Sequence, residues 1–124
     1  MERVTGIGGF FFPARSPEEL SRWYADRLGI DVPPADYETS SWRQQAGPTV
    51  FAPMATASPS LARTAGRWTL NLRVVRLDAM VEQLRGAGVS VEVDPETYPN
   101  GRFASLTDPE GNGIQLWQPD GADG

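Results

Sequence analysis

The side chains best suited to ligand recognition lie in two segments with strand-like alternation. In one segment apolar residues alternate with Thr69, Asn71 and Arg73, and near the C-terminus Gln115 and Trp117 alternate with apolar neighbours. Successive side chains of a strand point to opposite faces, so each set shares one face. Such a face could bind a polar or anionic ligand, with Arg73 as a bidentate donor. The alternative is a solvated face without a ligand.

Candidates for catalysis are few. The chain has no histidine and no cysteine, which excludes Ser-His-Asp-type triads, thiolate nucleophiles and metal sites ligated by either residue. Asp108 and Glu110 form a carboxylate pair, but both lie in a turn sequence, where Asp commonly caps the backbone. Glu92 and Glu96 have no evident basic partner. We therefore assign no catalytic residue, and a metal-free enzyme with a carboxylate base is kept as an alternative.

Composition indicates a single domain of ordinary globular type. The 124 residues are 40% hydrophobic and 22% charged, with a net charge of −5. This acidity, without any basic run, argues against nucleic acid as a partner. No apolar run approaches the roughly 20 residues that span a bilayer. The first residues lack a signal-peptide pattern, so we expect a cytoplasmic protein with no membrane partner.

One helix is predicted early in the chain. Ser16 is the expected N-cap, Pro17 the first helical residue and Glu19 the partner of Ser16 in a capping box. Gly29 is expected to end the helix. The apolar residues between them recur at helical spacing and predict one buried stripe: Leu20, Trp23, Tyr24 and Leu28.

The second half of the chain repeats this order of elements. A second amphipathic helix is predicted from residue 77 to about residue 84, where Leu77, Met80, Val81 and Leu84 form its apolar side. Strands are expected around both helices, at residues 4–12, 38–45 and 49–52 in the first half and 68–74, 89–93, 102–107 and 113–118 in the second.

These elements predict an α+β domain over residues 1–124, made of two βαβββ modules at about 4–54 and 67–119 that are joined by a linker at 55–66. One helix can cover only one face of the sheet in its module. Two such modules would bury their open faces against each other and form a cleft between them.

The βαβββ repeat and the segment from Asp108 to Leu116, DPEGNGIQL, resemble the vicinal oxygen chelate superfamily. Supporting similarity lies in the first helix, from Ser16 to Gly29, and in the second, from Leu77 to Val89. The superfamily includes glyoxalase I, extradiol dioxygenases, fosfomycin-resistance transferases and bleomycin resistance proteins. The resemblance implies a curved mixed sheet around a cleft, and a homodimer. It leaves the function open, because this fold serves many activities.

Enzymes of this superfamily hold a divalent metal with His, Glu or Gln side chains. The resemblance places those positions at Gly9, Ala52, Thr69 and Gln115. Only Gln115 has a suitable donor, and one amide oxygen cannot hold a catalytic ion against water. We therefore expect no metal and no cofactor.

A ligand-binding cleft is predicted from the polar strand faces and the aromatic residues. The resemblance places Gln115 at the position of a metal-ligating side chain of the family, so its face should line the cleft. The aromatic residues could stack on a flat ligand, although each could instead pack in the core, and Trp117 could lie in a core or a dimer contact. The predicted lining residues are Phe11, Trp42, Phe51, Thr69, Asn71, Arg73, Gln115 and Trp117.

The sequence thus favours a metal-independent protein that binds a small aromatic or amphipathic molecule, such as an antibiotic or another natural product, and that forms a homodimer. One alternative is a glyoxalase-like lyase or isomerase, or another enzyme of the superfamily, with non-standard catalytic groups. A second alternative is a structural or regulatory dimer without a ligand.

Overall fold

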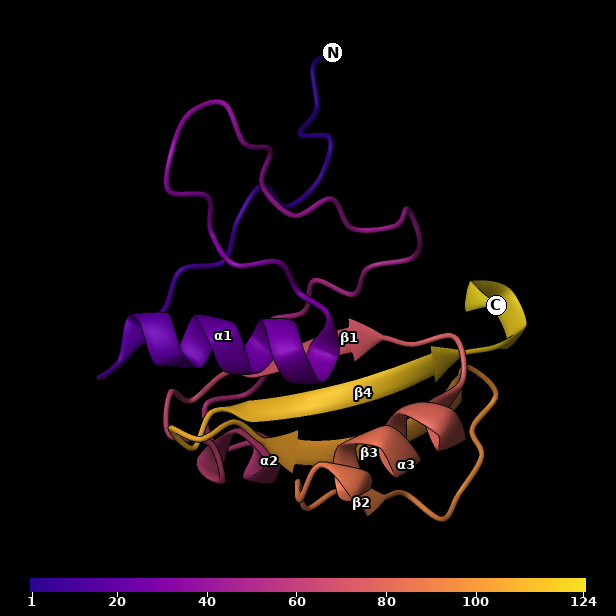
Figure 1. The fold of residues 1–124 in the computed structure, drawn as a ribbon. Helices are drawn as coiled ribbons and strands as arrows, with labels where there is room; N and C mark the ends of the chain where they lie inside the picture. Colours follow the sequence, from indigo (N-terminus) through magenta and orange to yellow (C-terminus); the bar gives the residue numbers. More distant parts are fainter.

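The computed structural model describes residues 1–124 and places the sheet entirely in the second half of the chain (Figure 1). The strands run in the order β1-β4-β3-β2. β1 is parallel to β4, whereas the other neighbouring pairs are antiparallel. Their bounds are β1 Thr69–Arg73, β2 Glu92–Val93, β3 Gly101–Thr107 and β4 Gly113–Pro119. The predicted α+β class with a curved mixed sheet is confirmed.

The second predicted module is present with its elements in the predicted order. Its helix, α3 (Leu77–Gly86), follows β1 and buries Leu77, Val81 and Leu84. β2 is shorter than the predicted strand 89–93, because the amide of Val89 bonds to the carbonyl of Leu84 and completes the helix end instead. The last hairpin, β3 and β4, forms within a residue of the predicted bounds.

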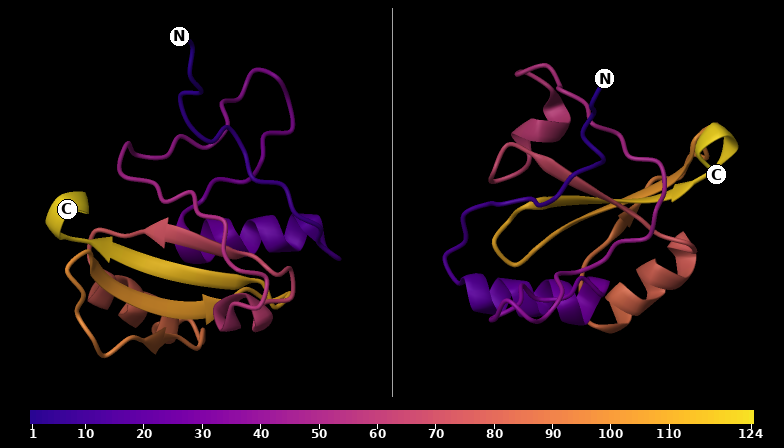
Figure 2. Two further views of the ribbon diagram at one scale, coloured as in Figure 1. Left: turned by 180° about the vertical axis from the view of Figure 1, so that it is seen from behind. Right: turned by 90° about the horizontal axis from the view of Figure 1, so that it is seen from above.

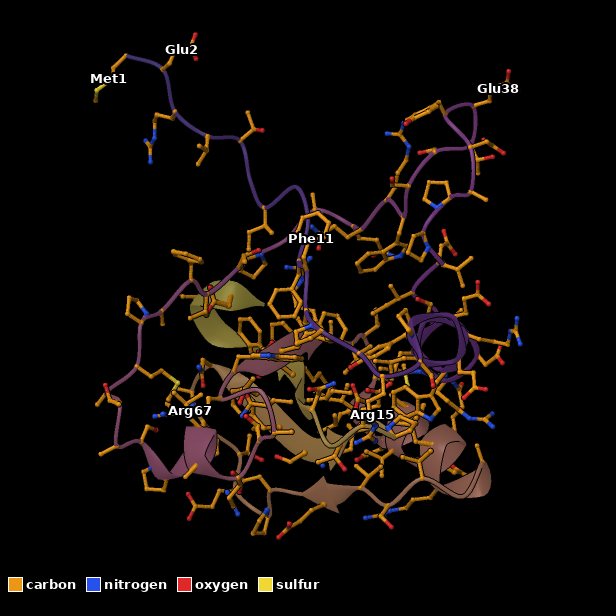
Figure 3. All side chains as sticks on the ribbon, turned by 90° about the vertical axis from the view of Figure 1, so that its left-hand side faces the viewer. Met1, Glu2, Phe11, Arg15, Glu38 and Arg67 are labelled. Carbon is orange, nitrogen blue, oxygen red and sulfur yellow. The ribbon has the colours of Figure 1, made fainter.

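The first half of the chain contributes one helix and no strand. The strands predicted at 4–12, 38–45 and 49–52 are wrong for the single chain, because these segments take part in no sheet. A strand requires a neighbour that pairs with its backbone groups, and no backbone hydrogen bond joins these segments to another strand. Figure 3 shows Met1 and Glu38 on two long excursions away from the sheet and helices.

The first predicted helix is α1 (Pro17–Leu28), with Gly29 in a left-handed conformation at its end (φ 74°). The predicted capping box is wrong, because the side chain of Ser16 makes no capping hydrogen bond. The carboxylate of Glu110 instead accepts from the backbone amides of Arg15 (2.6 Å) and Ser16 (3.2 Å). An acceptor from the distant β3–β4 turn therefore satisfies the start of α1.

A single core lies between the sheet and the two longer helices. α1 and α3 lie on the same side of the sheet (Figure 2). Ile114 and Leu116 of β4 are almost fully buried beneath them, and α1 contributes Leu20 and Tyr24. The helix of the first half therefore covers the sheet of the second half.

The predicted linker contains a four-residue helix, α2 (Pro59–Ala62), and the C-terminus ends in a short 3-10 helix at Gly121–Asp123. After α2 the chain runs close to β4, since a side chain at Gly113 would clash with Cγ2 of Thr64. No helix has the length and apolar character needed to cross a membrane.

Candidate functional site

The face of the sheet opposite α1 and α3 is called here the open face. The short α2 lies on this side (Figure 2), and Thr64 after it approaches Gly113 at one end of the face. Neighbouring strands align its side chains in rows. The middle row consists of Asn71, Gln115, Ser105 and Glu92, on four successive strands. Neighbouring strands lie about 4.8 Å apart, so this row spans about 14 Å. Asn71, Ser105 and Glu92 are exposed and Gln115 is half-buried, so the middle row of the open face is polar, accessible to solvent and mostly uncharged.

Asn71 and Gln115 form a pair of side-chain amides in this middle row of the open face. They are register partners in the parallel β1–β4 ladder. The side-chain nitrogen of Asn71 donates to the amide oxygen of Gln115 at 2.7 Å. The contact fixes both side chains and leaves the remaining amide atoms free for other partners.

The next row carries aromatic side chains. Trp117 of β4 and Phe103 of β3 are register partners, and their rings are parallel with centroids 6.2 Å apart. Tyr98 packs edge-on against Phe103. Trp117 is only 3% exposed, and its indole nitrogen donates to the carbonyl of Asn100 at 2.9 Å. Phe103, which is half-buried, is therefore the more accessible aromatic side chain of the pair.

Arg73 shares the aromatic row but is already engaged. Its guanidinium donates to the carbonyl oxygens of Pro48 and Gln45, the latter at 2.7 Å. Gly47 allows this approach, because a side chain there would lie 2.9 Å from the guanidinium carbon. In the single chain Arg73 thus holds the segment 45–49 against β1 rather than presenting a free fork to a ligand.

The structure brings five of the eight predicted lining residues together on the open face: Thr69, Asn71, Arg73, Gln115 and Trp117. The other three belong to the first half and do not join them. Phe11 is 94% exposed and Phe51 85% exposed, and Trp42 is also exposed. The lining of a cleft by these eight residues stays a prediction.

Two residues of the open face were missed by the sequence reasoning, Ser105 and Phe103. The signal was available, because residues 103, 105 and 107 alternate with the buried Ala104 and Leu106 in the strand that pairs with β4. Only the register with Gln115 and Trp117 shows that they belong to the same face.

The predicted carboxylate pair in the β3–β4 turn has a structural role. Asp108 is 4% exposed and accepts hydrogen bonds from the Tyr24 hydroxyl (2.7 Å), the Asn112 side chain (2.7 Å) and the backbone amides of Glu110 and Asn112. Burial, together with the Asp108 carboxylate, raises the pKa of the Tyr24 hydroxyl above its ordinary value. With Glu110 at the start of α1, the turn joins the first half to the sheet. These carboxylates are therefore not free to act on a substrate at the open face.

The residues present do not fit a divalent metal. Gly9 and Ala52 provide no side-chain donor, and the amide oxygen of Gln115 accepts from Asn71. No group of three or more acidic residues is arranged to hold an ion. Neutral amide and hydroxyl oxygens without a carboxylate or imidazole are too weak a set for a catalytic cation in water. We therefore derive no step through a metal.

A shallow hollow also lies on the helical side, between α3 and β2. It is lined by two carboxylates and a guanidinium around a small apolar patch: Asp78, Val81, Glu82, Arg85, Gly86 and Val93. The guanidinium of Arg85 donates to the carbonyl of Val91 at 2.8 Å. Opposite charges with local partners are typical of an ordinary solvated surface, so we do not assign the site here.

Comparison with known proteins identifies relatives by sequence and by structure. The sequence model of a family described as glyoxalase-like domain matches residues 9–117. No match was found among curated proteins. The crystal structure of TnmS3, an antibiotic binding protein from Streptomyces sp. CB03234, is similar with a TM-score of 0.62 at 24% identity, covering 97% of this chain and 100% of that one.

Two further structures share the fold. A glyoxalase/bleomycin resistance protein from Streptomyces sp. CB03234 has a TM-score of 0.52 at 26% identity, over 86% of this chain and 94% of that chain. A glyoxalase family protein from Bacillus anthracis has a TM-score of 0.54 at 18% identity, over 95% of this chain and 100% of the other. At such low identities the likeness establishes the architecture.

Proposed function

Because the chain belongs to the glyoxalase-like domain family, we propose that it is a small-molecule-binding protein whose ligand lies on the open face of the sheet. The membership also confirms the resemblance to the vicinal oxygen chelate superfamily. The observation that carries the proposal is the contrast between the two faces of one sheet. One face is buried under α1 and α3, whereas the other presents ordered amides beside an aromatic row.

The ligand that suits this face is a small aromatic or amphipathic molecule, such as an antibiotic or another natural product. Amide and hydroxyl groups supply directional hydrogen bonds, and Phe103 supplies apolar area one row away, a combination typical of small-molecule sites. Two structural neighbours are described as an antibiotic binding protein and as a glyoxalase/bleomycin resistance protein. Sequestration of this kind requires affinity and no reacting group. The proposed activity is therefore binding without a metal.

The test is a titration of tryptophan fluorescence with a panel of aromatic natural products. Trp117 lies in the row next to the Asn71–Gln115 amide pair, so a bound ligand should change its emission. A saturable change with at least one compound, with the compound recovered intact, is expected. Turnover of a compound, or no saturable change with any of them, would contradict the proposal.

We also propose that two copies of the chain form the working protein. The first half exposes many large hydrophobic side chains on segments that have strand-like sequences but no strand partner: Val4, Ile7, Phe10, Phe11, Val50 and Phe51. β1 is an edge strand of the sheet. Exposed apolar segments and a free sheet edge are features that a second copy can cover.

Sedimentation equilibrium tests the second copy directly. We expect a dimer at micromolar concentration, and weaker association when Phe51 is replaced by Ser. The matched control is Tyr37→Ser, which removes an exposed aromatic residue from the irregular segment that follows α1. A monomer across the concentration range would contradict the dimer while leaving ligand binding to its own test.

A further inference from the structure

We propose that the Asn71–Gln115 pair selects neutral ligands in which a flat ring system carries a group, such as a carboxamide, with both a hydrogen-bond donor and an acceptor. This inference rests on the proposed function and specifies the chemical class of ligand for the same face. It differs from the expectation drawn from sequence, in which Arg73 made the face suitable for an anion. Three features of the structure carry it.

The first feature is the set of hydrogen-bonding atoms that the pair leaves free. Each primary amide has two N–H donors and one oxygen acceptor. One N–H of Asn71 and one lone pair of Gln115 are used in their mutual contact at 2.7 Å. The oxygen and the second N–H of Asn71 and both N–H groups of Gln115 remain, so neighbouring strands present acceptor and donor groups side by side. A ligand group with the complementary pair, such as a carboxamide, can bond to both.

The second feature is the charge around the pair. Arg73 is the cation that lies nearest to the pair along β1. Its guanidinium already donates to two backbone carbonyls of the segment 45–49. Glu92 lies at the far end of the same row as the amides and is exposed. A carboxylate ligand would meet no free cation in this row and would be repelled by Glu92 and by the net charge of −5.

The third feature is the apolar surface beside the pair. Phe103 lies diagonally across from Gln115, one row away, and side chains two residues apart on one face of a strand are about 7 Å apart. Its ring is parallel to that of Trp117. A flat ring system can therefore cover Phe103 while its polar edge reaches the amides.

A matched series of three naphthalenes tests this selection. 2-Naphthamide offers a donor and an acceptor, methyl 2-naphthoate offers acceptors alone, and 2-naphthoate is an anion. Only 2-naphthamide can also donate a hydrogen bond to the Asn71 oxygen, and one hydrogen bond contributes about fivefold in affinity, so we expect 2-naphthamide to bind about fivefold more tightly than either of the others. Affinity is measured by tryptophan fluorescence, and contact is located by the shifts of the Asn71 and Gln115 side-chain amide signals in ¹⁵N NMR spectra.

Substitution of the Asn71–Gln115 pair tests whether these two side chains cause the preference for 2-naphthamide. The double variant Asn71→Leu, Gln115→Met removes every amide donor and acceptor of the pair, so the preference for 2-naphthamide should fall to about twofold or less. Thr107→Val is the matched control, because Thr107 is an exposed open-face residue of β3 outside the row of amides. It should retain the full preference. Circular dichroism confirms that both variants are folded.

The outcomes separate this inference from the proposed function. Equal affinities for the three compounds, or an unchanged preference in the double variant, would overturn the selection by the pair while binding to the face stands. The inference also fails if 2-naphthamide does not bind at concentrations where a natural product of the panel does. If no compound of either set binds, the proposed function itself fails.

Discussion

The two halves of this chain have similar patterns of predicted elements in their sequences, but only the second half forms a sheet in the structure. The second half forms a four-stranded sheet with a helix packed on it. The first half forms only α1, and most of its strand-like residues are exposed. The difference teaches that an alternating pattern specifies a face, whereas a sheet also requires a neighbouring strand to complete its hydrogen bonds.

The halves are nevertheless joined at defined points. Tyr24 of α1 is buried in the common core and donates to Asp108. Glu110 accepts from the start of α1, and Arg73 holds the segment 45–49. Substitutions in the core of the second half and at the contacts between the halves should therefore differ in their effect on stability.

The largest effect is expected from truncation in the core of the second half. Leu116 is fully buried on β4, and Leu116→Ala should lower the free energy of unfolding by about 2–5 kcal/mol. Phe51→Ala, in the first half, should change the unfolding energy of the monomer by less than about 0.5 kcal/mol, because Phe51 is 85% exposed. Urea denaturation at low protein concentration measures both. Equal losses would show that the first half is packed as firmly as the second.

A smaller loss is expected from the turn that joins the halves. Asp108→Ala removes the carboxylate that accepts from the Tyr24 hydroxyl and from the Asn112 side chain. Both donors then lose this partner in the interior of the protein. We expect the free energy of unfolding to fall by about 2–3 kcal/mol. Asp36→Ala is the matched control, since Asp36 accepts two backbone amides in an exposed turn and should cost less. A smaller loss for Asp108→Ala than for the control would contradict the role of the turn.

The Tyr24 hydroxyl should make part of the stability depend on alkaline pH. Its pKa is raised in the folded protein above the ordinary value of about 10, so the contribution is fully present below about pH 10 and is lost as the pH rises toward the folded pKa. The stability difference between the native protein and Tyr24→Phe, about 1 kcal/mol at about pH 8, should therefore shrink by about pH 11. Denaturation at both pH values measures it, with the exposed Tyr37→Phe as control. A difference that grows with pH would contradict the assignment.

The smallest effect is expected at Arg73. Arg73→Met should release the segment 45–49 and lower the free energy of unfolding by less than about 1 kcal/mol, because the guanidinium contacts lie near the surface. Trypsin should cut more quickly after the neighbouring Arg43, which mass spectrometry can follow. Arg76→Met removes a nearby arginine with no side-chain hydrogen bond and should leave that cut unchanged. An unchanged rate in Arg73→Met would show that the segment is held by other contacts.

Much of the second half was predictable because its signals are local. Alternation in residues 68–74 and the glycines and proline of the turn set the strands, and the apolar stripe from Leu77 to Leu84 set α3. The bounds of α1 also followed from Pro17 and Gly29. The sequence could not show that Glu110 accepts from the amides at the start of α1. Glu110 lies 94 residues or more from them along the chain, and no local pattern connects it to the helix.

The candidate site was predicted in part for the same reason. A period of two placed Thr69, Asn71 and Arg73 on one face, and Gln115 with Trp117 on another. Sequence could not show that these are one face, since the register between β1 and β4 depends on the packing of the core. Nor could it show that Arg73 contacts backbone carbonyls of the first half, because a contact with a backbone carbonyl does not depend on the residue types or on their spacing in the sequence.

We propose that the ligand binds to the open face rather than to the helical side. A ¹⁵N–¹H correlation spectrum recorded during titration with a binding compound of the natural-product panel tests it most directly. We predict saturable shifts concentrated at Asn71, Ser105 and Gln115, with the backbone signals of Asp78 and Glu82 unchanged. Shifts concentrated at Asp78 and Glu82, in the hollow beside α3, would contradict the account.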